Sequence, residues 1–192
     1  MIMKNDNELN NIDKNKSPSA KNGKVIWFYG LSGSGKSTIA DRLAEILISS
    51  RKLAVYRLDG DVLRTGLNSD LGFSERDRVE NIRRAAEVAK ILADEGFVVI
   101  ASLITPQRTM RDLARDIIGA EKFVGIYVKA SLETCENRDP KGLYKKMRKG
   151  EIKSFTGVDS PFEEPADNAL VIETELLDIE AAVQMTLRTC EL

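Results

Sequence analysis

Short apolar runs alternate with longer amphipathic stretches from Lys24 to the end of the chain. The short runs are rich in the β-branched and aromatic residues that favour strands, and lie at Val25–Tyr29, Ala54–Leu58, Phe97–Ala101, Phe123–Val128 and Ala169–Ile172. The longer stretches have helical apolar spacing and lie at Ser37–Ser50, Ser74–Glu95, Pro106–Ile118, Leu132–Glu136, Gly142–Lys149 and Asp178–Cys190. This alternation predicts a single α/β domain over residues 24–192, with a five-stranded, mainly parallel sheet and helices on both faces.

Two segments break the alternation. Residues 1–23 are rich in Asn, Lys, Asp and Ser and include Pro18, so they lack the apolar surface needed to order themselves. We predict a disordered tail there, and an arm that docks on another subunit is the alternative. Residues 150–165 have few apolar side chains and are interrupted by glycine and proline, which predicts a long surface loop. Because such loops often cover active sites, residues 141–165 are the candidate lid.

The composition limits the class of protein. The chain has 192 residues, of which 42% are hydrophobic and 31% charged, and its formal net charge is -1. This balance gives no reason to expect nucleic acid or a membrane as a partner. No apolar stretch approaches the roughly 20 residues that span a bilayer, and the polar N-terminus does not resemble a signal peptide, so a cytoplasmic protein is expected.

Cysteine and histidine restrict the possible chemistry. Cys135 and Cys190 are far apart and fit no metal-ligand spacing, so we expect neither a disulfide framework nor a zinc site. The chain contains no histidine, which removes the commonest general base. Any acid–base catalysis must therefore come from carboxylates or lysines.

A glycine-rich loop stands between the first predicted strand and the first predicted helix. Its residues are Gly30, Leu31, Ser32, Gly33, Ser34, Gly35, Lys36, Ser37 and Thr38. They satisfy the G-x-x-x-x-G-K-[ST] pattern of a P-loop in the strand–loop–helix context that this pattern requires. In such a loop the backbone N–H groups face the phosphates of ATP, Lys36 reaches the β- and γ-phosphates, and Ser37 offers a hydroxyl to Mg²⁺. The motif predicts an ATP-dependent phosphotransferase with a P-loop kinase fold.

Two carboxylates follow the second predicted strand, in the sequence Leu58-Asp59-Gly60-Asp61. Ligands of open α/β sheets gather at the carboxyl ends of the strands, where Asp59 and Asp61 could approach the metal and accept a proton from an incoming hydroxyl. A helix N-cap followed by a turn explains the same residues equally well. The pattern alone does not choose between these interpretations.

The residues that follow Asp61 carry a resemblance to a known family. The segments that carry it are Asp59–Asn68, Leu71–Ser74, Arg78–Arg84, Ile104–Pro106, Arg138–Lys146 and Gly150–Pro161. In this order and spacing they resemble adenylylsulfate kinase over nearly all of residues 24–165. That family transfers the γ-phosphate of ATP to the 3′-hydroxyl of adenosine 5′-phosphosulfate (APS). The resemblance therefore implies that the products are 3′-phosphoadenosine 5′-phosphosulfate and ADP.

The resemblance also implies roles for individual residues. Asp61 matches the position expected to orient and deprotonate the 3′-hydroxyl, and Asp59 matches the neighbouring carboxylate near the metal. The acceptor nucleotide is expected to contact Arg64, Phe73, Arg78, Asn81, Ile104, Lys141 and Phe155. Guanidinium groups suit phosphosulfate oxygens, and the two aromatic rings would stack on the adenine. Arg83 and Arg84 receive no role, because ordinary surface positions or ion pairs explain them.

The family further implies a lid and partners. Its basic segment after Lys141 closes over both nucleotides, which would exclude water as a competing acceptor of the phosphoryl group. A homodimer and a functional link to an ATP sulfurylase, which supplies the acceptor, are also expected from the resemblance.

Three residues depart from the family pattern. Thr105 stands where many members carry a serine that is often regarded as a phosphoenzyme site. Its β-branch crowds the hydroxyl, and transfer between two bound nucleotides needs no covalent intermediate, so we predict direct transfer with Thr105 lining the acceptor pocket. Leu103 and Gln107 replace frequent aromatic residues. They leave open a kinase for a different small acidic nucleotide, whereas the complete P-loop and both carboxylates argue against a regulatory subunit without turnover.

Overall fold

The strands form one parallel sheet. A computed structural model of the chain describes residues 23–152, 154–165 and 169–192, and the predicted tail up to residue 22 lies outside this part. The described strands are β1 (Lys24–Tyr29), β2 (Val55–Asp59), β3 (Val98–Ser102), β4 (Phe123–Lys129) and β5 (Leu170–Glu173). Their order is β2-β3-β1-β4-β5, and each neighbouring pair runs parallel. The predicted five-stranded α/β sheet is confirmed.

The helices agree with the predicted ones except for an additional short helix. They are α1 (Lys36–Ser49), α2 (Gly60–Thr65), α3 (Glu75–Asp94), α4 (Arg108–Ile118), α5 (Leu132–Arg138), α6 (Leu143–Arg148) and α7 (Ile179–Thr189). Helix α2 was not predicted, because none of its residues is buried and it has no apolar stripe. It begins instead at the N-cap Asp59, whose side chain accepts a hydrogen bond from the backbone N–H of Asp61. Within the described ranges, no helix combines the length and apolar character needed to cross a membrane.

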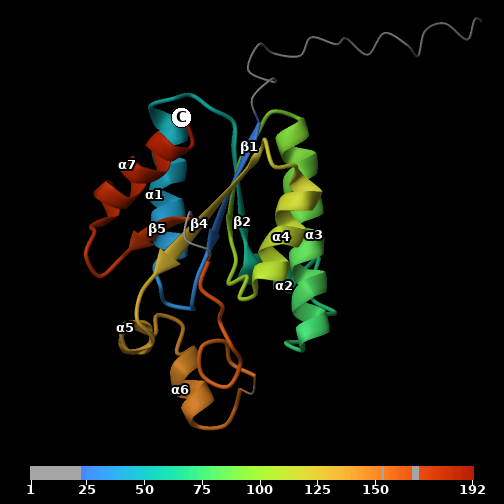
Figure 1. The fold of residues 1–192 in the computed structure, drawn as a ribbon, viewed down its shortest axis with the longest axis vertical. Coiled ribbons are helices and arrows are strands. Elements are labelled where there is room, and N and C mark those ends of the chain that lie inside the picture. Colours follow the sequence, from blue (N-terminus) through green and yellow to red (C-terminus); the bar gives the residue numbers. More distant parts are fainter. Residues whose placement is uncertain (1–22, 153, 166–168) are drawn as a thin grey trace, which may run out of the picture.

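Two layers of helices enclose the sheet. Helices α1 and α7 cover one face, and α3 and α4 cover the other (Figure 1). The alternation of side chains along β1 produces both interfaces, since Ile26 and Phe28 pack toward α1 and α7, whereas Trp27 packs toward α3 and α4. Strand β1 is therefore buried on both faces, and the P-loop that follows it starts from the rigid centre of the domain.

A smaller apolar cluster lies beneath the P-loop. It consists of Leu31, Ala130, Cys135, Tyr144 and Phe155. The Tyr144 hydroxyl donates a hydrogen bond to the carbonyl of Ser32 (3.0 Å), which links α6 to the P-loop. The segment predicted as a surface loop is thus anchored through buried Phe155. Cys135 and Cys190 are buried free thiols.

Candidate active site

Two glycines of the P-loop combine a positive φ angle with a close approach to neighbouring backbone. Gly30 and Gly33 have φ angles of 148° and 79°, in the region that glycine adopts without strain. A Cβ atom at these positions would lie 2.2 Å from the carbonyl oxygen of Val128 and 2.8 Å from that of Cys135. The two glycines therefore allow the loop to pass close to the backbone of its neighbours.

The N-terminus of α1 is arranged to receive an anion. Its N-cap is Gly35, which provides no side-chain cap, and its first turn carries no acidic residue. By contrast, α2, α3, α5 and α7 each begin with a side chain that accepts a backbone hydrogen bond. The backbone N–H groups of α1 and the positive end of its dipole are available to phosphate oxygens, so the loop fits ATP.

The Lys36 ammonium lies under the P-loop. It donates hydrogen bonds to the carbonyls of Gly30 (2.9 Å) and Leu31 (2.6 Å), and the residue is only 8% exposed. Burial lowers the pKa of Lys36 to about 8. In the described part of the chain its hydrogen bonds reach only neutral oxygens, so phosphate oxygens would be its first anionic hydrogen-bond partners.

Ser37 and Asp59 form the arrangement expected beside a magnesium ion. The Ser37 hydroxyl donates to Oδ2 of Asp59 (3.0 Å), and Oδ1 of Asp59 accepts from the backbone N–H of Asp61 (2.9 Å). The described residues contain no group of three or more His, Cys, Asp or Glu that could hold a metal. Mg²⁺ commonly uses one or two protein oxygens together with phosphates and water, so this pair of oxygen ligands fits it.

A cavity of about 850 Å³ joins the P-loop to the predicted acceptor residues. Its P-loop lining consists of Ser32, Gly33, Gly35, Lys36, Ser37 and Thr38. Every residue predicted for the acceptor side lines the same cavity: Asp59, Asp61, Arg64, Phe73, Arg78, Asn81, Ile104, Thr105, Lys141 and Phe155. Three predicted P-loop residues, Gly30, Leu31 and Ser34, do not line it. The structure therefore brings both halves of the predicted site into one space.

The predicted base and the predicted lid are in direct contact. The Lys141 ammonium forms an ion pair with Oδ2 of Asp61, which lies in the first turn of α2. The side chain of Asp61 is 61% exposed and that of Lys141 is 50% exposed. An incoming ligand can therefore reach both groups.

Two arginines surround the exposed aromatic residue of the acceptor side. The guanidinium carbon of Arg64 lies 4.5 Å from the centroid of the Phe73 ring, and that of Arg78 lies 5.9 Å from it. Arg78 also donates to the carbonyl of Ser154 (2.7 Å), which connects α3 to the candidate lid. Phe73 is 55% exposed, whereas Phe155 is 8% exposed and packs edge-on against Tyr144. The ring of Phe73 is thus the more accessible surface for a base.

Thr105 lies at the wall of the cavity and is 1% exposed. Its hydroxyl accepts a hydrogen bond from the indole N–H of Trp27 (2.9 Å), and its φ angle is 44°. Arg111 holds the same segment from behind by donating to the carbonyl of Thr105 (3.1 Å). The hydroxyl therefore has a structural partner inside the core.

Comparison with known proteins identifies the family of the chain. The family model described as adenylylsulphate kinase matches residues 22–173. The chain belongs to the adenylylsulphate kinase family. A curated adenylyl-sulfate kinase of Staphylococcus carnosus (strain TM300) is 51% identical over 174 residues, which cover 89% of this chain and 87% of that protein.

Solved structures of the family have the same fold. The Mycobacterium tuberculosis APS kinase CysC in complex with AMPPNP and APS is similar with a TM-score of 0.83 and 44% identity, over 89% of this chain and 99% of that chain. A hexameric APS kinase from Thiobacillus denitrificans is 33% identical with a TM-score of 0.67, over 91% of this chain and 30% of that one.

The residues that depart from the family pattern occupy different places. Leu103 lines the cavity and is buried, so it shapes the wall directly. Gln107 does not line the cavity, and its amide donates to Glu75 (3.1 Å) at the start of α3. Of these two residues, only Leu103 can change which acceptor binds by direct contact with it.

Sequence reasoning missed one end of the cavity. Its lining includes Arg138, Thr174, Leu177, Asp178 and Ile179, from the end of α5, the connection between β5 and α7, and the first residue of α7. The Arg138 guanidinium donates to the hydroxyl and the carbonyl of Thr174 (both 3.0 Å), and the Thr174 hydroxyl donates to the carbonyl of Ser34 (2.9 Å). Arg138 belongs to a segment of the family resemblance but received no role, and the other four residues carry no local motif. The pairing of β4 with β5 brings them to the P-loop.

Proposed function

We propose that this chain transfers the γ-phosphate of ATP to the 3′-hydroxyl of adenosine 5′-phosphosulfate. The observation that supports this proposal most strongly is the shared cavity, which is lined by both the P-loop and Asp61. The 3′-oxygen attacks the γ-phosphorus, and the bond from that phosphorus to the β–γ bridging oxygen breaks. The hydroxyl proton passes to the Asp61 carboxylate, and ADP leaves.

On the donor side, we assign the residues by charge and position. The free N–H groups at the start of α1 bind the phosphates of ATP, and Lys36 moves from neutral carbonyls to the β- and γ-phosphates. Ser37 and Asp59 would hold Mg²⁺, which would neutralise the charge that develops on the phosphates. The glycines keep the loop backbone in the required path.

On the acceptor side, Arg64, Arg78 and Asn81 bind the phosphosulfate and ribose of APS. Guanidinium groups donate in a planar fork that matches such oxygens. The adenine stacks on Phe73, and Phe155 forms the fixed opposite wall. Thr105 and Ile104 complete the pocket without covalent participation.

Residues 141–165 act as the lid in this proposal. Its first residue reaches Asp61, its middle part reaches Arg78 through Ser154, and Phe155 fixes it to the domain. These contacts reach the acceptor side of the cavity. A closed lid excludes water from the γ-phosphate. Lys153, which belongs to the basic segment after Lys141, lies outside the described residues.

A panel of acceptors tests the substrate assignment. Labelled ATP is incubated with one acceptor at a time. The acceptors are APS, adenosine nucleotides that have a free 3′-hydroxyl but lack the sulfate, and other small acidic nucleotides. Strong preference for APS is expected, with label in the 3′-phosphate. Preference for another acceptor would favour the alternative that Leu103 leaves open. If no acceptor received the label, the kinase activity itself would be contradicted.

We further propose a cytoplasmic homodimer that receives its acceptor from an enzyme joining sulfate to the α-phosphate of ATP, as an ATP sulfurylase does. The hexameric relative supports self-association within the family. Sedimentation of the full chain separates a dimer from a monomer or a larger assembly.

A further inference from the structure

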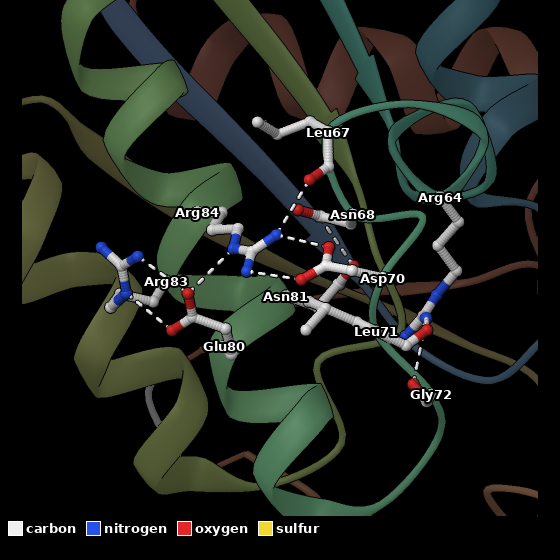
Figure 2. Close-up of polar contacts among 10 residues, drawn as sticks. All are labelled: Arg64, Leu67, Asn68, Asp70, Leu71, Gly72, Glu80, Asn81, Arg83 and Arg84. Atoms are coloured by element: carbon white, nitrogen blue, oxygen red, sulfur yellow. Dashed lines mark hydrogen bonds and ion pairs between the residues drawn. The ribbon is translucent and has the colours of Figure 1, made fainter.

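Two neighbouring arginines on α3 have different surroundings. Arg83 donates to Glu80 (2.8 and 2.9 Å) and lies 3.7 Å from Glu87, so its described ion pairs remain within the helix. Arg84 points to the other side, toward the segment that joins α2 to α3 (Figure 2). The side chain of Arg83 is 45% exposed and that of Arg84 is 25% exposed.

Arg84 holds the connecting segment, residues 66–72, which we call the acceptor loop. Its NH1 and NH2 groups donate to the two carboxylate oxygens of Asp70 (2.7 and 2.9 Å), and NH1 also donates to the carbonyl of Leu67 (2.9 Å). Its Nε donates to Glu80 (2.8 Å), which fixes the guanidinium on the helix. The planar fork of arginine can satisfy all of these acceptors at once.

The opposite side of the acceptor loop contacts the acceptor residues. Asn68 is completely buried and donates its amide to Oδ1 of Asn81 (2.9 Å). The carbonyls of Leu71 and Gly72 accept from the Arg64 guanidinium (3.1 Å each) (Figure 2). Both Arg64 and Asn81 line the cavity, whereas Arg84 does not.

We propose that Arg84 is a positioning residue for the acceptor: by clasping Asp70 and Leu67 it holds the acceptor loop in the conformation that orients Arg64 and Asn81 toward the substrate. This inference rests on the proposed function for the identity of the acceptor. Its geometric part concerns only the chain itself, since loss of the clasp frees the acceptor loop whatever nucleotide binds.

The expected effect is moderate and selective. Exposed ion pairs contribute little singly, but a bidentate arginine within a network is the favourable case. Misplacing binding groups weakens the acceptor complex more than the chemical step. The Arg84→Gln variant should therefore raise KM for APS about threefold to tenfold, with KM for ATP unchanged and kcat within about twofold.

Arg83→Gln is the matched control, because it removes the same charge from the adjacent position of the same helix. It should leave both KM values unchanged. Asp70→Asn should raise KM for APS as Arg84→Gln does, and the double variant should add little to either change, because both remove one interaction. Arg84→Lys keeps the charge without the fork and should restore KM only partly.

Hydrogen exchange of the acceptor-loop amides provides a readout that needs no substrate. The N–H groups of Asn68 and Leu71 are bonded to the carbonyls of Leu63 (2.8 Å) and Asn68 (3.1 Å), so both report the loop conformation. Exchange should accelerate in Arg84→Gln and not in Arg83→Gln. Equal exchange in the two variants, or equal KM values for APS in an active enzyme, would overturn the proposal. Failure of the wild-type protein to use APS would contradict the proposed function. The hydrogen-exchange result would then still show whether Arg84 holds the acceptor loop in place.

Discussion

The Lys141 ammonium contacts the Asp61 carboxylate although 80 positions of sequence separate the two residues. One belongs to the segment after α5 and the other to the first turn of α2. The contact places a cation of the proposed lid beside the proposed catalytic base. Binding of an anionic acceptor can draw Lys141 away from Asp61 and leave the carboxylate free to take the proton.

Replacement of Lys141 should weaken the acceptor more than the donor. Lys141→Met keeps most of the side-chain stem and removes the charge. We expect kcat/KM for APS to fall about tenfold or more, with KM for ATP changed less, because a charge-assisted contact to the acceptor is lost. Steady-state kinetics with each substrate varied measures this.

Lys145→Met serves as the control for Lys141. Lys145 is exposed, lies on the adjacent helix α6 and does not line the cavity. Its variant should retain wild-type kinetics. Equal losses in both variants would mean that the general positive charge of the lid matters and the contact with Asp61 does not.

Thr105 should be dispensable for chemistry but not for stability. Thr105→Val removes the acceptor of the buried Trp27 N–H, which should lower the free energy of unfolding by about 1–3 kcal/mol. Direct transfer predicts that kcat stays within about tenfold of wild type, since no covalent intermediate passes through the hydroxyl. Urea unfolding and turnover measure the two effects separately.

Thr105→Ser keeps the acceptor and should retain most of the stability. Intact-mass measurement after incubation with ATP alone should find no phosphorylated wild type. A phosphothreonine at position 105, together with a loss of turnover by several orders of magnitude in Thr105→Val, would refute direct transfer.

The pKa of Lys36 predicts how ATP affinity depends on pH. Folding lowers this pKa from its ordinary 10.5 to about 8, so the free enzyme keeps the ammonium below pH 8 and loses the proton above it. Phosphates bind the cation, and binding above pH 8 must therefore take up a proton. Affinity should be flat below about pH 8 and fall with a slope approaching tenfold per pH unit above it.

The same shift fixes the sign of a stability effect. The unfolded chain retains the Lys36 proton to higher pH than the folded chain, so the contribution of Lys36 to stability rises with pH between about 8 and 10.5.

Calorimetric titration with AMPPNP across this pH range tests the predicted pH dependence of nucleotide affinity. The Lys36→Met variant should bind AMPPNP weakly, and its affinity should no longer depend on pH in this range. If the affinity of the variant still fell with pH at the same slope, another group would be responsible for the pH dependence.

The sequence was most informative where the chemistry depends on neighbouring residues. The P-loop from Gly30 to Thr38 encodes its own backbone path, and its context between a strand and a helix made the donor side predictable. Asp59 caps α2, as one of its two interpretations predicted, and its other carboxylate oxygen accepts a hydrogen bond from Ser37, while a role beside the metal stays a prediction. The acceptor side became predictable only through the family resemblance.

Features that depend on distant contacts could not be predicted. Helix α2 is held by a cap and has no apolar stripe, so periodicity could not reveal it. Thr174 reaches the P-loop only because β5 pairs with β4. Arg83 and Arg84 are chemically identical in the sequence, and only the helix orientation gives the second one the acceptor loop as its partner.

The most direct test of the proposed kinase is ADP release with APS as acceptor, measured for wild type and Asp61→Asn. The variant keeps the size of the side chain but cannot accept the proton. We predict rapid, APS-dependent release by wild type and a fall in kcat of about 100-fold or more in the variant, with KM for ATP nearly unchanged. Wild-type turnover in Asp61→Asn would contradict the assignment of Asp61 as the base.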